Sequence, residues 1–292
     1  MATTKVVSYS ELDTYRQCRY KHELAYRQRW QPDETAAALS RGKLFHEVLE
    51  LHYTGIERAL RGDTGSYAEV FLPRIRELLS DPQSGAQTEE QELVEWIFRG
   101  YWDLYGADPD WEIQAVELAV EEWLPTPKGN RSSFRMKGKV DLLVRDNSAG
   151  GGLWVVDHKT CRNLPKSDKD IDLDDQMAIY IKLLRMRGLD VRGAIMNFCR
   201  TQKLVRAMTD DERFKRMHTA RTDVELDVII GEVYDTFREA YKPRNGMPPR
   251  SPNTDTCRWR CPFTEPCLSA RKGGDIQILL GETGFHQDFT RH

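Results

Sequence analysis

The stretch Trp154-Val-Val-Asp-His-Lys-Thr160 decides the fold of this chain. Its apolar first half is typical of a buried β-strand, and its second half carries charge. On a strand, Asp157 and Lys159 lie two positions apart, so both side chains project from the same face. A carboxylate beside an ammonium group at a strand end makes a metal ligand with a neighbouring base possible. The pattern Asp-x-Lys alone is also compatible with a surface ion pair beside a turn, and that role is the commoner one.

A second carboxylate lies in the preceding strand. Asp141 ends the sequence Gly138-Lys-Val-Asp141, and the Gly-rich segment 147–152 then predicts a hairpin or loop. If the two strands pair across this loop, Asp141 and Asp157 can share one divalent cation. Hard oxygen ligands favour Mg²⁺ or Mn²⁺. Such a site could activate water and stabilise charge on a scissile phosphate, with Lys159 holding the attacking water or the developing charge.

Other residues could complete this site. Gln176 and Tyr180 are four apart in the next predicted helix, so they share one face, although Tyr180 could equally belong to the core. His46 lies in an earlier predicted helix, and a neutral imidazole is a reasonable third ligand for Mn²⁺. A single helical histidine is more often structural or exposed. Glu117 on the first predicted strand is either a further acidic group at the site or an exposed strand residue, and the second role is the commoner.

Hydrophobic periodicity predicts a mixed α/β chain. A capping-box pattern from Ser10 to Asp13 predicts the start of the first helix. Three consecutive strands joined by short turns indicate at least one antiparallel pair, and residues 243–266, rich in Pro, Arg and Cys, are expected to form a loop. The predicted helices cover residues 10–26, 39–60, 67–79, 89–105, 172–187 and 223–241, and the predicted strands cover residues 111–122, 133–145, 153–160 and 191–200.

Composition excludes several classes of protein. The chain has 292 residues, a mass of 33.9 kDa and 39% hydrophobic residues, enough for a substantial core. No apolar run reaches about 18 residues, so we expect no membrane span. The N-terminal segment lacks the apolar region of a secretory signal, so we expect a cytoplasmic protein. The pattern Gly-x-x-x-x-Gly-Lys-Ser/Thr is absent, which argues against a helicase.

Charge is distributed unevenly along the chain. The formal net charge is −3, so bulk charge alone would not bind DNA. Residues 88–123 contain eleven acidic side chains and one basic side chain, whereas residues 185–221 contain ten Lys or Arg and four acidic side chains. The basic stretch could contact a polyanion, or the two stretches could be solvated helix faces of opposite sign. No base-reading motif is recognisable, so sequence-specific cutting is not expected.

The cysteines suggest a second metal-binding group. Three of the six form the pattern C-x3-C-x5-C, namely Cys257, Cys261 and Cys267. Thiolates this close bind a tetrahedral zinc ion or an iron–sulfur cluster, and without a secretory signal disulfides are not the default. Cys18 is the candidate for the fourth thiolate. Cys161 and Cys199 fall outside the pattern, and Cys199 is expected to be buried in a strand.

In order along the chain, these motifs resemble those of the PD-(D/E)XK nuclease superfamily, in its RecB-like branch. The matching patterns are Gly-x-x-x-His at 42–46, Gly-x-x-Asp at 138–141, Asp-x-Lys at 157–159 and Gln-x-x-x-Tyr at 176–180. Val140 stands where the family's named proline would precede the acid, and Asp157 replaces the commoner glutamate. The resemblance implies a restriction-endonuclease-like α/β fold, with a mixed-sheet core in the order αβββαβ and helical additions at the N-terminus.

The resemblance also implies a role for each site residue. The metal ligands would be His46, Asp141, Asp157 and the backbone carbonyl of His158. Lys159 would be the catalytic lysine. Gln176 and Tyr180 would position the DNA backbone or support the site.

A subset of this branch, the AddB-type nuclease domains and the CRISPR-associated Cas-four exonucleases, has one cysteine before the nuclease core and three after it. Residues 8–18 also look like their N-terminal segment. The resemblance implies that Cys18, Cys257, Cys261 and Cys267 hold a structural [4Fe-4S] cluster that joins the two ends of the chain. The spacing C-x3-C departs from the usual C-x2-C, so zinc remains an alternative.

The resemblance predicts a DNA exonuclease that depends on Mg²⁺ or Mn²⁺ and acts on single-stranded DNA or duplex ends in recombination, repair or replication. A stand-alone chain of this size also looks like phage-encoded members, which would place it in a bacterial cell or a phage-infected host. The alternatives are a non-catalytic or partner-dependent DNA-end-binding subunit of a recombination or CRISPR-adaptation complex, and a zinc-stabilised interaction module. An oligomer or a helicase partner stays open.

We expect one nuclease domain over residues 1–292. Its expected parts are a helical part at 1–106, the nuclease core at 107–200, a helix with the Cys-rich segment at 201–275 and a tail at 276–292. Basic residues flank the cysteines, and Trp259 and Phe263 among them could stack on unpaired bases. The alternative for Trp259, which we favour, is that it packs against the cluster.

Overall fold

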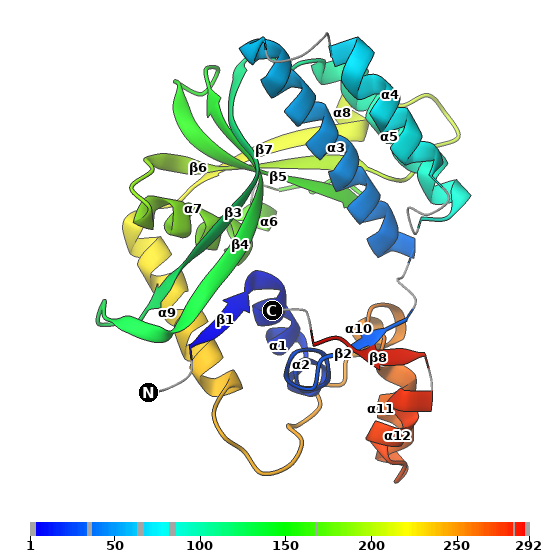
Figure 1. Cartoon of the computed structure of the whole chain (residues 1–292), viewed down its shortest axis with the longest axis vertical. Helices are drawn as coiled ribbons and strands as arrows, with labels where there is room; N and C mark the ends of the chain where they lie inside the picture. The colour runs from blue at the N-terminus through cyan, green and yellow to red at the C-terminus, as the bar shows by residue number, and fades with distance from the viewer. Residues whose placement is uncertain are drawn as a thin grey trace. The chain divides into compact units, whose positions relative to one another are not determined.

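The computed structural model describes residues 4–33, 37–62, 67–81, 86–167, 169–282 and 284–289 (Figure 1). The chain folds as two compact units, each made from separated segments. The terminal unit consists of residues 1–35, 121–137 and 227–292. The sheet unit consists of residues 36–120 and 138–226.

The sheet unit is built on a mixed β-sheet, as the sequence predicts. Within it, residues 142–146 of β4 (Arg131–Asp146) pair antiparallel with β5 (Gly152–Cys161), and β5 pairs parallel with β6 (Val191–Arg200). β7 (Phe214–Ala220) adds to β6 in the antiparallel direction, and β3 (Trp111–Pro125) pairs with β4. The predicted antiparallel pair across the Gly-rich turn is therefore confirmed.

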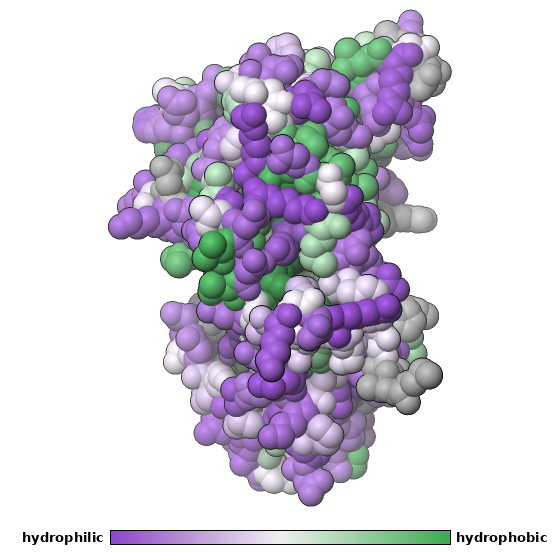
Figure 2. Space-filling model, turned by 90° about the vertical axis from the view of Figure 1, so that its left-hand side faces the viewer, coloured by the Kyte–Doolittle hydropathy of each residue, from purple (hydrophilic) through white to green (hydrophobic). Residues whose placement is uncertain are grey.

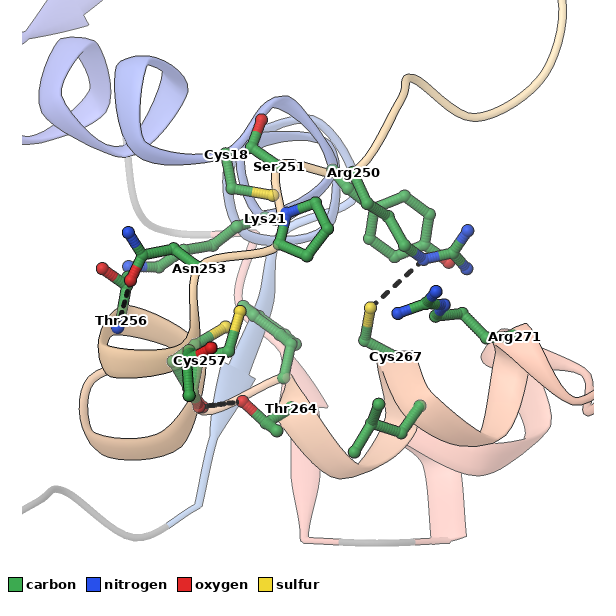
Figure 3. A pocket seen from close by; sticks show the side chains of 16 residues that line it. Cys18, Lys21, Arg250, Ser251, Asn253, Thr256, Cys257, Thr264, Cys267 and Arg271 are labelled. Atoms are coloured by element: carbon green, nitrogen blue, oxygen red, sulfur yellow. Dashed lines mark hydrogen bonds between the residues drawn. The ribbon is translucent and has the colours of Figure 1, made fainter.

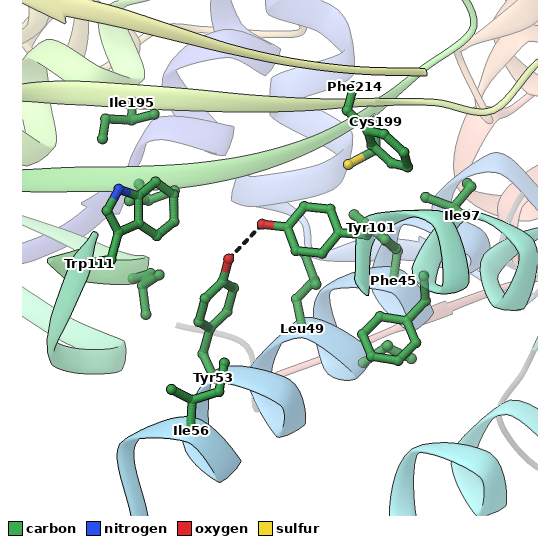
Figure 4. Packing of buried hydrophobic residues seen from close by; sticks show 14 of the residues in the cluster. Phe45, Leu49, Tyr53, Ile56, Ile97, Tyr101, Trp111, Ile195, Cys199 and Phe214 are labelled. Atoms are coloured by element: carbon green, nitrogen blue, oxygen red, sulfur yellow. Dashed lines mark hydrogen bonds between the residues drawn. The ribbon is translucent and has the colours of Figure 1, made fainter. Parts of the chain in front are cut away.

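Helices cover the sheet of this unit on both faces. α3 (Ala37–Arg61), α4 (Tyr67–Ser80) and α5 (Thr88–Tyr105) pack together and against one face (Figures 1 and 4). α7 (Asp175–Met186) packs against β5 and β6 from the other face, preceded by the short α6 (Lys169–Asp172). Because side chains alternate along β5, its odd-numbered residues near the end reach α7 and its even-numbered ones reach α3. The short α8 (Asp210–Arg213) precedes β7.

The terminal unit brings together residues from both ends of the sequence. β1 (Lys5–Ser8) pairs parallel with residues 134–137 of β4, and α1 (Tyr9–Gln17), α2 (Arg19–His22) and a π-helical turn (Glu23–Arg27) follow it. β2 (Trp30–Pro32) pairs antiparallel with β8 (Phe285–Gln287). The remaining helices are α9 (Asp223–Ala240), which begins in the sheet unit, α10 (Thr254–Trp259), α11 (Thr264–Arg271) and α12 (Ile276–Glu282).

A hydrophobic cluster holds the early and late segments of this unit together. Its buried residues are Tyr20, Leu24, Trp30, Phe263 and Leu280. Cys18, Cys261 and Cys267 pack against it. The tail at 276–292, which the sequence left without an interpretation, thus contributes a core residue. Residues 283 and 290–292 of the tail lie outside the described part.

The N-terminal helix differs from its prediction. Instead of one helix over residues 10–26, the helix stops at Gln17, because Cys18 has an extended backbone with φ −161° and ψ 115°. The cap is Ser8, whose hydroxyl accepts from the Glu11 amide, rather than Ser10. A capping residue must itself be extended, and Ser8 meets this requirement as the end of β1.

Three further predictions need correction. Residues 243–266 contain α10 and the start of α11, with Asn253 capping α10. The basic stretch 185–221 is not a helix face, since it contains the strands β6 and β7 and the short helix α8 between them. Trp259 is 77% exposed, so it does not pack against the cysteines, whereas Phe263 is buried.

Hydrophilic side chains predominate on the face shown in Figure 2, and hydrophobic residues form separate patches there. In the part of the chain that the structure describes, no helix is long and apolar enough to cross a membrane.

Candidate active site

The site is built around the end of β5, where Asp157 and Lys159 face the first turn of α7. Asp157 is 2% exposed, and its Oδ1 accepts from Gln176 Nε2 at 3.2 Å. Lys159 Nζ lies 2.7 Å from Asp157 Oδ2 and donates to Gln176 Oε1 at 3.0 Å. Burial raises the pKa of Asp157, although the charge of Lys159 opposes this. Burial acts to lower the pKa of Lys159, but the charge of Asp157 raises it, so Lys159 is an ammonium ion.

Asp141 brings the second carboxylate from β4 and meets His46 of α3. Its Oδ2 lies 3.2 Å from His46 Nδ1 and accepts from the His158 amide at 2.9 Å. Burial acts to raise the pKa of Asp141, but the hydrogen bond and charge of His46 lower it overall. Conversely, burial acts to lower the pKa of His46, and Asp141 raises it overall. The two acids therefore have pKa values shifted in opposite directions, which is a common property of catalytic sites.

Gln176 and Tyr180 support Lys159 from α7. The Asp174 carboxylate accepts from the Gln176 amide at 2.7 Å and so caps this helix at the site. Gln176 Nε2 also donates to Tyr180 OH at 3.1 Å. A side chain at Gly138 would overlap the Tyr180 ring, so the glycine before Asp141 makes room for the tyrosine. The predicted pairing of Gln176 and Tyr180 on one face is what the structure has.

The His158 side chain points away from the two carboxylates, into the core on the α3 face. Its ring stacks on Tyr53 with centroids 5.6 Å apart, and Asn197 Nδ2 lies 2.8 Å from its Nδ1. Burial lowers the pKa of His158 to about 3, so the imidazole is neutral. The His158 backbone, by contrast, lies between Asp157 and Lys159.

Glu117 is neither exposed nor joined to the two aspartates by a hydrogen bond. It is half-buried, has a φ of 52° and pairs with Lys139. Burial raises the pKa of its carboxyl group. The structure therefore gives Glu117 a lysine partner of its own, and we do not assign Glu117 to the site.

The donor set suits a hard cation, although the same atoms are now paired within the protein. Asp157 Oδ2 is buried and, among the residues that the structure describes, has no hydrogen-bond partner beyond its ion pair with Lys159. Asp141 is paired with His46. Among the described residues, no three His, Cys, Asp or Glu side chains converge closely enough to hold one metal ion as they stand.

In the terminal unit, Cys18, Cys257, Cys261 and Cys267 line one cavity of about 190 Å³ (Figure 3). Arg250 Nε donates to Cys267 Sγ at 3.2 Å. The Thr264 hydroxyl donates to the carbonyl groups of Cys257 and Cys261. The remaining two cysteines lie in the sheet unit, and Cys199 is buried in β6 as predicted.

Sequence reasoning missed a set of buried polar residues behind the site, in the sheet unit. The set consists of the buried residues Tyr53, Tyr101, Asp108 and Asn197, together with Arg216, whose side chain is 16% exposed. Asn197 sits in a predicted strand, but a single amide there carries no signal of its own. Arg216 lies on β7, which has no strict alternation and was not predicted.

The model of the PD-(D/E)XK nuclease superfamily matches residues 6–268, most of the chain. The chain belongs to this superfamily. PD-(D/E)XK membership accounts for the mixed sheet and confirms the resemblance inferred from the motifs at 42–46, 138–141, 157–159 and 176–180.

Two solved structures are distantly similar to this PD-(D/E)XK chain. A candidate exonuclease from Eubacterium rectale has 19% identity and a TM-score of 0.47, over 88% of this chain and 88% of its own. The protein SSO0001 has 19% identity and a TM-score of 0.35, over 76% of this chain and 84% of its own. At this distance they carry no argument about activity. No curated protein sequence matches this chain.

Proposed function

We propose that this chain is a DNA exonuclease that hydrolyses phosphodiester bonds at DNA ends with the help of Mg²⁺ or Mn²⁺. The observation that carries the proposal is the grouping of Asp141, Asp157 and Lys159 at the end of β5. Membership of a nuclease superfamily supports hydrolytic chemistry. DNA as the substrate, the preference for ends, a role in recombination, repair or replication, and a cytoplasmic location in a bacterium or phage-infected host belong to the proposal.

The residues that would hold the cation are Asp141, Asp157, His46 and the His158 carbonyl. Carboxylate oxygens with one imidazole are a suitable donor set for Mn²⁺ or Mg²⁺. The buried Asp157 Oδ2, which has an ion pair with Lys159 and no further hydrogen bond among the described residues, supports this assignment. When bound, the cation would supply Lewis-acid activation of the water and the phosphate.

The protein's own groups would position and stabilise the reaction. Lys159 is protonated and held by Asp157 and Gln176, so its ammonium group can donate to a phosphate oxygen as negative charge develops. Gln176 fixes the direction of Lys159, and Tyr180 fixes Gln176. These contacts are made before substrate binds, which reduces the reorganisation that the reaction requires.

The test is cleavage of end-labelled single-stranded and duplex DNA by anaerobically purified protein with Mn²⁺. We expect stepwise loss of label with the wild type and a loss of about a hundredfold or more with Lys159→Ala, the scale for one transition-state donor. Lys128→Ala removes an exposed lysine of the terminal unit and should cut normally. Equal cutting by wild type and Lys159→Ala would contradict the assigned site. Binding of DNA ends without cutting would favour a partner-dependent end-binding subunit.

For the cysteine cavity we propose a structural [4Fe-4S] cluster held by Cys18, Cys257, Cys261 and Cys267. The four residues line one cavity. Four thiolates are the usual ligand set of such a cluster, and they also suit a zinc ion. Bound there, the cluster would connect Cys18 to the C-terminal helices of the same unit.

Metal analysis after anaerobic purification tests the cluster. We expect a brown protein containing iron and acid-labile sulfide in equal amounts. Alanine at any of the four cysteines should remove most of the iron, whereas Cys161→Ala should retain it. A colourless protein that contains zinc would contradict the cluster and favour a zinc site.

A further inference from the structure

A continuous network of polar side chains, most of them buried, runs through the sheet unit and ends at His158. It begins at Arg216 of β7, whose guanidinium donates to Asp108 Oδ1 at 2.5 Å and Oδ2 at 2.9 Å. The faces of the guanidinium are covered by Tyr105 and Trp111, with ring centroids 3.5 and 3.9 Å away. The cation is therefore fixed by both ion pairing and ring contacts.

The network passes through two tyrosines in the core (Figure 4). Tyr53 OH donates to Asp108 Oδ2 at 2.6 Å and lies 2.5 Å from Tyr101 OH. Arg216 also donates to Tyr101 OH, at 2.9 Å. Each polar atom in this part has a partner, and a fully satisfied buried network is rigid.

Asn197 of β6 connects the network to β5. Its Nδ2 donates to Tyr101 OH at 2.9 Å, and the same amide group lies 2.8 Å from His158 Nδ1. Asn197 is fully buried, at 0% exposure. Since the amide nitrogen can only donate, His158 Nδ1 accepts, and the ring is held in one orientation between Asn197 and the Tyr53 ring.

The other end of His158 reaches the active site. While its ring is held in the core, its backbone amide donates to Asp141 Oδ2 at 2.9 Å. Asp141 is the carboxylate from β4 that also contacts His46. A path of direct contacts therefore runs from Arg216 through Asn197 and His158 to Asp141.

Stability alone is a weak reason for such a network. Replacing such an ion pair by apolar residues is often neutral or stabilising, so a contribution to stability does not by itself explain the Arg216–Asp108 pair. We propose instead that the network is a positioning device for the active site, in which Asn197 and Arg216 fix the His158 peptide and thereby the direction of the Asp141 carboxylate. The inference rests on the proposed nuclease function, because it assigns supporting residues to that site.

The decisive variant is Asn197→Leu, with Asn197→Asp beside it. Asn197→Asp keeps the shape and the acceptor that faces Arg216 at 3.5 Å but removes the donors to His158 and Tyr101. We expect both variants to need about 10- to 100-fold more Mn²⁺ for half-maximal cleavage, as is typical when partners of metal-site residues are removed. Their affinity for DNA without metal should be unchanged.

The matched control is His52→Phe. His52 is a buried residue of the same core, and its Nδ1 lies 2.8 Å from Tyr67 OH. The substitution removes this contact but no hydrogen bond of the network. It should lower the melting temperature and leave the Mn²⁺ dependence unchanged. If Asn197→Leu also changes only the melting temperature, the network is merely structural and the proposal is overturned.

Direct Mn²⁺ binding, followed by electron paramagnetic resonance of the free ion, separates this inference from the proposed function. If the wild type cleaves no DNA, the proposed function fails, but the binding experiment still tests the network. Binding that Asp141→Asn abolishes and Asn197→Leu weakens would support the inference. Equal binding by wild type and Asn197→Leu, or no binding by the wild type, would overturn it.

Discussion

At the scale of single residues, the alternation of side chains at 157–159 separates chemistry from packing. Asp157 and Lys159 face α7 and Gln176, while His158 between them enters the core. Neighbouring residues of one strand thus serve two different environments. A single residue, His158, therefore contacts both sides of the sheet, with its amide on Asp141 and its ring on Asn197.

Substitution of Gly138 should disturb the position of Tyr180 beside Gln176. Gly138→Ala would place a methyl group against the Tyr180 ring, displacing it from Gln176. We expect a loss of about 1–3 kcal/mol in the free energy of unfolding, the usual range for overpacking, measured with urea. Gly231→Ala on α9 has open space around its new methyl group and should be neutral or stabilising. A neutral Gly138→Ala would show that the tyrosine can move freely.

His52 predicts how stability depends on pH. Burial lowers its pKa to about 3, whereas an unfolded histidine titrates near 6.5. Between these two pH values, the histidine of the unfolded chain binds a proton that His52 of the folded chain does not bind. The stability that depends on a neutral His52 is therefore fully present above about pH 6.5 and is lost as the pH falls towards 3. Urea unfolding at pH 7.5 and 5.5 should show a loss of about 1 kcal/mol attributable to His52. His52→Phe should reduce this loss, and an unchanged loss would contradict the assignment.

At the scale of elements, the longer helices and strands could be predicted because their signals are local. The predicted bounds of β6 agree with the structure, and those of α3, α4, α5 and α9 differ by a few residues at most. β7 and the short strands β1, β2 and β8 were missed, since their formation depends on partners distant in sequence. The pairing of Trp30 with Gln287 cannot be inferred from either segment alone.

The same distinction applies to the site. His46, Asp141, Asp157, Lys159, Gln176 and Tyr180 could be proposed because each lies in a short pattern, and the structure brings them together. Their roles in catalysis remain a prediction. Asn197 and Arg216 could not be found, because what distinguishes them is the register of β6 with β5 and β7.

The start of α1 provides a test at this scale. Ser8→Ala removes the hydroxyl that accepts from the Glu11 amide at 3.3 Å and should cost about 1 kcal/mol of stability, as is typical of a lost N-cap. Ser10, which the sequence pattern suggested as the cap, is exposed and lies inside the helix. Ser10→Ala should therefore change the free energy of unfolding by less than about 0.5 kcal/mol. A larger loss of stability with Ser10→Ala than with Ser8→Ala would support Ser10 as the helix cap.

At the scale of the whole molecule, the chain has two units with hydrophobic clusters of their own. The terminal unit depends on α12, whose Leu280 is 0% exposed and belongs to the same cluster as Tyr20 and Trp30. Leu280→Ala should cost about 2–5 kcal/mol, whereas Ile278→Ala, 58% exposed on the same helix, should be nearly neutral. Chemical denaturation of both variants measures this difference. Equal effects would mean that α12 is not docked on the cluster.

The composition of the terminal unit also bears on how the protein is made. Its cysteine cavity needs Cys18 and Cys267, and its small sheet needs Trp30 and Gln287. A ribosome delivers the first member of each pair long before the second, whereas the last segment of the sheet unit ends at residue 226. The sheet unit can therefore fold during synthesis, as domains generally do in order of emergence. The terminal unit can only close after α11 and β8 have left the ribosome, so its cysteine cavity is completed later than the point at which the sheet unit is able to fold.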